Sequence, residues 1–180
     1  MLLLTPAQIL WVNMITAVTL ALTLAFEPTE EDVMKRPPRD PESALLSPIL
    51  IWRIVFVSVI LMVGTFGLFI WYRDQGSSIE EARTIAVNTL VFFEIFYLFS
   101  VRQFFASAFT FDTFRGNKYI LYACGILIVF QLLFTYIPPM QVLFQTTDLS
   151  TIQWLHIIVV SSSVFFLVEF EKWIARLRKN

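Results

Sequence analysis

The chain alternates long apolar runs with short polar breaks, a pattern that predicts helices crossing a bilayer. A helix needs about 20 mostly apolar residues to span the hydrocarbon core. Five runs have this length: about 7–26, 48–72, 82–101, 118–137 and 152–173. Clusters of proline, glycine and serine separate them, as expected where helices end. The pattern therefore predicts an all-α polytopic membrane protein, with five transmembrane helices in a bundle and a single membrane domain over residues 1–180.

Lysine and arginine are distributed unevenly between the two ends of these runs, which predicts an orientation. Cytoplasmic loops of membrane proteins carry an excess of both residues. One side holds most of the 13 bases: Lys35, Arg36, Arg39, Arg102, Arg115, Lys118, Lys172, Arg176, Arg178 and Lys179. The other side holds Arg73 and Arg83. We therefore expect an integral, multi-pass protein with its N-terminus outside, its C-terminus in the cytoplasm, and a cytoplasmic loop at 27–47.

The first apolar run carries polar side chains that are costly in hydrocarbon. Asn13 and Thr16 are three residues apart, so a helix places them on one face. Polar groups inside a membrane usually face the interior of a bundle or an ion pathway. After Phe26 the chain becomes rich in charge and proline, which ends the helix. This run is therefore the first candidate for a functional element.

The order of residues around this run resembles a known family. Gln8-Ile9-Leu10-Trp11-Val12-Asn13, then Thr16, then Phe26-Glu27-Pro28 and Lys35-Arg36-Pro37-Pro38-Arg39 are similar to P-type ATPases of the calcium-pump branch. They match the sixth transmembrane helix and the loop that follows it. The remaining runs are similar to the last four helices of that family. The resemblance implies the ion-pathway and scaffold portion of an ATP-driven cation pump, from its sixth to its tenth helix.

The resemblance assigns Asn13, Thr16 and Glu94 to a partial cation site. Calcium takes six to eight oxygen ligands, usually including carboxylates, and these side chains offer an amide oxygen, a hydroxyl and a carboxylate. Glu94 lies deep in an apolar run, where a charge is expected only with a partner. Two alternatives stay open. In the first, Asn13 and Thr16 are not ligands but form hydrogen bonds to neighbouring helices. In the second, Glu94 is a protonated packing residue.

One departure from the family leaves the transported ion open. Calcium pumps carry an aspartate directly after the residue that matches Thr16, and this chain has Ala17 there. A methyl group neither coordinates nor neutralises a cation. Val18 and Leu20 also replace the usual glycine and proline, which help to unwind that helix. Calcium is the ion that the resemblance implies, and a monovalent cation, a proton or a smaller number of sites stay open.

Two glycines and one arginine in the second run predict how this helix packs and where its charged group lies. Gly64 and Gly67 are small enough to allow a neighbouring helix to approach closely. Arg53 lies near the cytoplasmic end, so we expect its charged group to extend to the lipid headgroups.

Other polar residues interrupt the later runs. Asn88 is unusual in the third, and Gln131 stands alone in the fourth, which we otherwise expect to serve only in packing. Glu169 lies near the end of the last run, where pairing with Lys172 or an arginine is expected. The lone His156, near an interface, is expected to be structural.

Composition agrees with a membrane protein and excludes several other classes. Hydrophobic residues make up 57% of the chain and charged residues 15%. The net charge of −1 argues against a nucleic-acid partner. The single cysteine, Cys124, excludes a disulfide framework and a cysteine-rich metal site. The start of the chain lacks the basic segment of a signal peptide.

The sequence contains no catalytic constellation of its own. It lacks an Asp-Lys-Thr-Gly phosphorylation motif, a glycine-rich phosphate loop and a Ser/His/Asp arrangement. We therefore expect no catalytic or cofactor-binding residues here, with ATP and Mg²⁺ serving the complete pump.

The expected partners are the lipid bilayer and the remaining membrane helices and cytoplasmic domains of such a pump. Self-association of the isolated chain through its first helix is also expected. The alternative function is a free-standing five-span binding or regulatory subunit derived from a pump. A membrane-embedded enzyme is disfavoured because no nucleophile–base pair is present.

Overall fold

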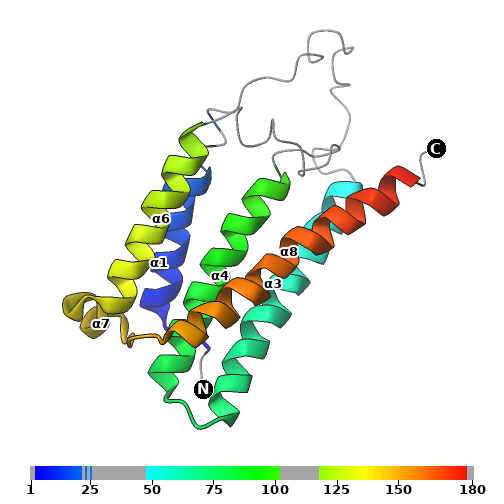
Figure 1. The fold of residues 1–180 in the computed structure, drawn as a ribbon. Coiled ribbons are helices and arrows are strands. Elements are labelled where there is room, and N and C mark those ends of the chain that lie inside the picture. Colours follow the sequence, from blue (N-terminus) through cyan, green and yellow to red (C-terminus); the bar gives the residue numbers. More distant parts are fainter. Residues whose placement is uncertain (1–2, 22, 24, 26–47, 102–117, 178–180) are drawn as a thin grey trace.

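The computed structural model describes residues 3–21, 23, 25, 48–101 and 118–177, and its regular elements there are all helices (Figure 1). In chain order they are α1 (Pro6–Thr16), the π-helix η1 (Ala17–Ala21), α3 (Pro48–Asp74), α4 (Ile79–Val101), α6 (Lys118–Tyr136), α7 (Pro138–Phe144) and α8 (Thr151–Leu177). Within these residues, α3, α4, α6 and α8 are long and apolar enough to cross a membrane, and the helix at Pro6–Leu20 is shorter. The predicted all-α membrane bundle is confirmed.

The predicted loop at 27–47 lies outside the described residues, as does the end of the first apolar run. Pro138 and Pro139, which follow the fourth apolar run, start the short helix α7, which was not predicted. Proline fits the first turn of a helix because the N–H that it lacks would have no partner there.

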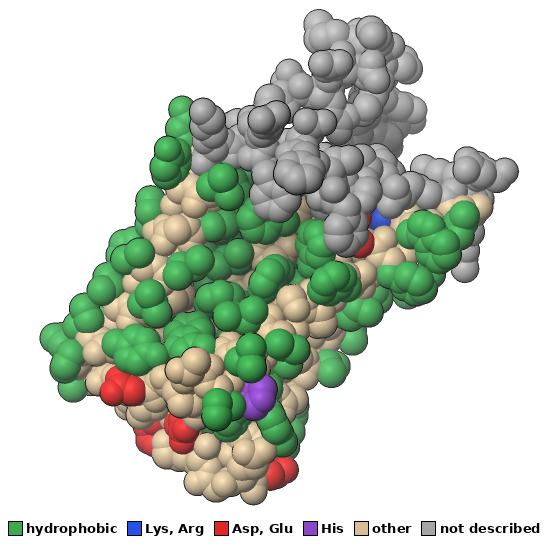
Figure 2. Space-filling model, viewed as in Figure 1, with side chains coloured by type: hydrophobic (Ala, Val, Ile, Leu, Met, Phe, Trp, Pro, Cys, Tyr) green, Lys and Arg blue, Asp and Glu red, His purple; other side chains and the backbone are tan. Residues whose placement is uncertain are grey.

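Helix α4 lies between the other helices, with α1 and α6 on one side and α3 and α8 on the other (Figure 1). Of its apolar stretch, 61% is buried inside the protein, against 17% for α3. Successive long helices are antiparallel, so α1, α4 and α8 run in one direction and α3 and α6 in the other. The outer helices expose many apolar side chains (Figure 2), a surface that suits lipid.

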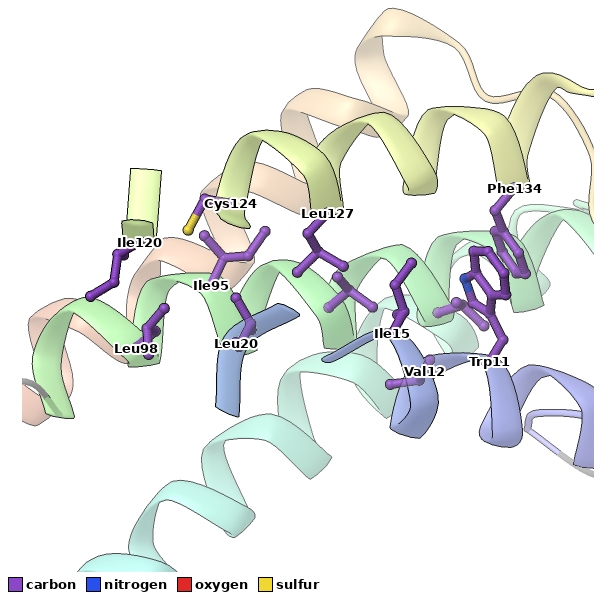
Figure 3. Packing of buried hydrophobic residues seen from close by; sticks show 12 residues of the cluster. Trp11, Val12, Ile15, Leu20, Ile95, Leu98, Ile120, Cys124, Leu127 and Phe134 are labelled. Atoms are coloured by element: carbon purple, nitrogen blue, oxygen red, sulfur yellow. The ribbon is translucent and has the colours of Figure 1, made fainter. Parts of the chain in front are cut away.

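A cluster of apolar side chains joins α1, η1, α4 and α6 (Figure 3). Its buried members are Trp11, Val12, Ile15, Leu20, Val87, Val91, Ile95, Leu98, Ile120, Cys124, Leu127 and Phe134. The Trp11 ring stacks on that of Phe134, with centroids 5.5 Å apart and planes inclined by 13°. Because lipid tails are as apolar as these side chains, close packing rather than escape from water holds the helices together here.

Helix α1 begins with a capping box and loses its α-geometry after Thr16. The Thr5 hydroxyl accepts a hydrogen bond from the Gln8 N–H at 3.3 Å, and the Gln8 side chain accepts one from the Thr5 N–H at 2.9 Å. From Ala17 the helix widens into η1, although the segment contains neither glycine nor proline. The Thr16 and Thr19 hydroxyls donate to carbonyls four residues earlier, a contact that bends helices.

Buried charges connect α8 to α3 and α4 near the end of the bundle where α8 finishes. Lys172 Nζ donates to Glu169 Oε1 at 2.6 Å and to the Ser100 carbonyl at 2.7 Å. Arg53 Nη2 donates to Glu171 Oε2 at 3.0 Å. The pairing expected for Glu169 is confirmed. The headgroup position expected for Arg53 is wrong, because a carboxylate of α8 holds its guanidinium inside the protein.

Gly64 allows α3 to approach α4 and α8 closely, whereas Gly67 faces open space. A Cβ atom at position 64 would overlap Phe93 Cζ and would lie 3.3 Å from Val160 Cγ1. A Cβ atom at position 67 would meet no described atom within 4 Å. The close approach expected at both glycines is therefore confirmed for Gly64 and wrong for Gly67.

This contrast predicts different effects of the same substitution. Gly64→Ala is expected to destabilise the bundle by about 1–3 kcal/mol, because the fully buried Phe93 ring would have to move to admit the new methyl group. Gly67→Ala is the matched control and is expected to be neutral or slightly stabilising, since alanine favours helix more than glycine does. Thermal unfolding in detergent measures both. Equal effects of the two substitutions would contradict the close contact at Gly64.

Candidate functional site

Thr16 and Glu94, two of the three predicted cation ligands, lie beside each other. Thr16 is the last residue of α1, and Glu94 lies on α4, against which α1 packs. The Thr16 hydroxyl donates to the Val12 carbonyl at 2.9 Å and lies near enough to the Glu94 carboxyl group to interact with it. Both side chains are half-buried. The structure thus brings a hydroxyl and a carboxylate together at the contact between the two helices.

The Glu94 carboxyl group has one oxygen that is not satisfied within the described part of the chain. Its Oε2 atom is buried, and no described residue forms a hydrogen bond with it. An ionised oxygen in such surroundings is costly unless a cation or a donor reaches it. The group is therefore suited to bind a cation or to hold a proton.

Asn13 lies apart from this pair, on the surface of α1. It is exposed together with Leu10, Met14 and Ala17, which share one face of the helix. Thr16 lies at the buried edge of that face and Asn13 at its exposed edge. The spacing correctly placed both residues on one side of α1, but only Thr16 reaches Glu94. Ala17, exposed beside them, contributes no side-chain oxygen.

The pair can form only part of a metal site. Among the described residues, no group of three or more His, Cys, Asp or Glu side chains is placed to hold a metal ion. Thr16 and Glu94 offer one hydroxyl and two carboxylate oxygens, and calcium requires six to eight. Further oxygens would have to come from elsewhere.

A chain of hydrogen bonds that was not predicted links α1, α6 and α4. Trp11 Nε1 donates to Gln131 Oε1 at 2.9 Å, Gln131 Nε2 donates to Asn88 Oδ1 at 3.3 Å, and Asn88 Nδ2 donates to Thr135 Oγ1 at 3.1 Å. Gln131, Asn88 and Thr135 are fully buried. We name these four side chains the amide network. The sequence indicated this network through Asn88 and Gln131, two amides in separate apolar runs, since polar side chains in membrane helices usually pair with one another.

Comparison with known proteins supports the family resemblance. Residues 1–174 match the family described as cation transporting ATPase, C-terminus. The chain is 39% identical over 173 residues to a probable cation-transporting ATPase F of Mycobacterium bovis, covering 96% of this chain and 19% of that protein. It is 35% identical over 177 residues to calcium-transporting ATPase 1 of Yarrowia lipolytica, covering 98% and 19%. It is 36% identical over 178 residues to calcium-transporting ATPase type 2C member 2 of Mus musculus, covering 95% and 18%.

The matches extend over nearly the whole chain but over only about a fifth of each of these relatives. The described helices and the motif around Asn13 and Thr16 agree with this result. The chain belongs to the C-terminal region of calcium-pump-like P-type cation-transporting ATPases.

Proposed function

We propose that this chain forms part of the transmembrane ion pathway, and part of the scaffold, of an ATP-driven cation pump. The observation that carries the proposal is the Glu94 carboxyl group near Thr16, whose Oε2 atom is buried and accepts no hydrogen bond from the described residues. A cation between these side chains would satisfy the carboxylate, and the hydroxyl lone pairs would contribute a further ligand. Thr16 and Glu94 are therefore the core of our proposed partial site.

Asn13 completes the proposed partial site from the exposed face of α1. Its amide would meet an ion together with oxygens from the pump's remaining membrane helices, which would cover this face. This agrees with the three oxygens of Thr16 and Glu94 being too few for a calcium ion. Where those helices are missing, the same face favours self-association of the chain.

Two observations bear on the identity of the transported ion. Calcium is supported by the names of two of the relatives, which are calcium-transporting ATPases. Ala17 argues for weaker binding of a divalent ion, because the carboxylate that calcium pumps carry at this position is missing. A monovalent cation, a proton or fewer bound ions per cycle are the other possibilities that this substitution favours.

We place the start of α1 outside and the end of α8 in the cytoplasm. Acidic side chains gather at the end of the bundle where α3 meets α4 (Figure 2), including Glu80 and Glu81 in the first turn of α4. Arg53 and Lys172 lie at the opposite end, where the excess of basic residues favours the cytoplasm.

ATP and Mg²⁺ would bind in cytoplasmic domains of the pump outside this single membrane domain. The residues present do not fit such a site, since the sequence contains no phosphorylation motif and no phosphate loop. This chain's part would be to change its ion access when those domains are phosphorylated.

Membranes that contain the native polypeptide test this function. An immunoblot against residues 175–180 is expected to show a band several times larger than 20.9 kDa. The same membranes are expected to hydrolyse ATP only when a transported cation is present, in a series with Ca²⁺, Mn²⁺, Na⁺, K⁺ and acid pH. A band near 20.9 kDa without such activity would instead favour a free-standing binding subunit.

A further inference from the structure

We propose that the amide network positions α1 against α4 and thereby holds Thr16 opposite Glu94. Gln131 is then a positioning residue for cation binding, although its own helix α6 carries no candidate ligand. The inference rests on the proposed function of Thr16 and Glu94. It adds a group of residues that the cation itself would not touch.

Because α1 and α4 run parallel, a link between them at Trp11 and Asn88 also fixes their relative position at Thr16 and Glu94. Both helices run in the same direction through the bundle (Figure 1). Trp11 precedes Thr16 by five residues, and Asn88 precedes Glu94 by six, which correspond to about 7.5 Å and about 9 Å along the helix axes. Because these offsets differ by only about 1.5 Å, joining Trp11 to Asn88 through α6 places Thr16 and Glu94 at nearly the same height.

Apolar packing alone would leave this register weakly defined. Contacts among the aliphatic side chains are not directional, whereas hydrogen bonds require a narrow range of distance and angle. The bonds of the amide network also have little freedom to rearrange. Asn88 Nδ2 donates additionally to the Thr84 carbonyl at 2.9 Å, and the Thr135 hydroxyl donates to the Gln131 carbonyl at 2.8 Å. The Asn88 amide is therefore fixed both from its own helix and from α6, and the Gln131 amide is fixed by Trp11 on one side and Asn88 on the other.

The first test removes a single N–H group in the native, full-length polypeptide. Trp11→Phe keeps an aromatic ring against Phe134 but leaves Gln131 Oε1 without the indole donor. The cation concentration for half-maximal ATPase activity is expected to rise about three-fold, with the maximal rate unchanged, as the usual strength of such bonds implies. Gln131→Leu breaks the link to Asn88 as well and is expected to raise the half-maximal cation concentration about tenfold.

Trp154→Phe is the matched control. It also removes an indole hydrogen bond, from Trp154 Nε1 to the Tyr136 hydroxyl at 2.8 Å, but this bond joins α8 to α6 and does not involve α1. The cation concentration for half-maximal ATPase activity of Trp154→Phe is expected to equal that of the wild type. The double variant Trp11→Phe/Gln131→Leu is expected to be no worse than Gln131→Leu alone, because both changes break the same link.

A second readout reports the position of α1 without any ATPase measurement. Cys124 on α6 is buried in the cluster that α1 covers. N-ethylmaleimide labelling of this cysteine in detergent, followed by mass spectrometry of its peptide, is expected to be faster in Trp11→Phe and Gln131→Leu than in Trp154→Phe.

The two readouts separate the possible failures. Unchanged labelling would overturn the claim that the amide network holds α1. Faster labelling with an unchanged half-maximal concentration would overturn its role in cation binding. A loss of maximal rate alone would mean that the network serves only stability, and would overturn the positioning role. A wild-type polypeptide without cation-stimulated ATPase activity would overturn the proposed function together with the positioning role.

Discussion

Glu94→Gln in the complete pump is expected to raise the cation concentration for half-maximal ATPase activity by about 10–100-fold. The substitution keeps the size of the side chain but removes the negative charge beside Thr16. Interactions with a charged group contribute about 1.5–3 kcal/mol, and 1.4 kcal/mol corresponds to a factor of ten in affinity. A titration of ATPase activity with the transported cation, at fixed ATP and Mg²⁺, measures the shift.

Glu80→Gln provides the control for Glu94→Gln on the same helix. Glu80 lies in the first turn of α4, far along the chain from the contact with Thr16, so its neutralisation is expected to leave the titration unchanged. If Glu94→Gln also leaves the titration unchanged, Glu94 is a packing residue that carries a proton. The ion pathway would then have to be sought elsewhere in the pump.

Lys172→Met is expected to destabilise the bundle by about 3–5 kcal/mol, the usual effect of removing one member of a buried ion pair. Lys172 is only 2% exposed and Glu169 only 6%, so water cannot replace the ammonium group. The substitution also removes the hydrogen bond to the Ser100 carbonyl, in the last turn of α4. Thermal unfolding of the purified protein in detergent, followed by size-exclusion chromatography, measures the loss.

A double substitution separates the charge effect from a loss of packing. Lys172→Met/Glu169→Leu removes both charges and is expected to recover most of the lost stability, since an apolar replacement of a buried pair is often neutral. Arg73→Met, which replaces a half-buried arginine in the last turn of α3, is the control and is expected to change stability little. A double variant as unstable as Lys172→Met alone would show that the length and packing of the lysine matter more than its charge.

The sequence was sufficient to predict the helices because the bilayer imposes a length and a polarity on each of them. It also proposed Thr16 and Glu94 as cation ligands, through the order of residues shared with the calcium-pump branch, and this assignment stays a prediction. Periodicity assigns a residue to a face of its own helix. For Asn13 and Thr16 that information was correct but incomplete, since the boundary between the buried and exposed parts of α1 passes between them.

The contacts between helices could not be predicted because they depend on which helix lies opposite and at what height. Arg53 illustrates this: an arginine near a helix end usually extends to the headgroups, but Glu171 lies opposite it on α8. Gly64 and Gly67 look equivalent in the sequence, and only the position of Phe93 distinguishes them. Gln131 likewise gained its partners from two other helices.

The π-helix η1 also affects how the length of this segment can vary. Its hydrogen bonds join residues five apart rather than four, so it accommodates more residues per turn than an α-helix. A one-residue deletion within Ala17–Ala21 would let the segment return to α-geometry while the following residues keep their places. The same deletion between Trp11 and Thr16 would turn Thr16 about 100° around the axis of α1, away from Glu94. Single-residue gaps among related sequences are therefore expected to fall in η1 and to be absent from the turn before it.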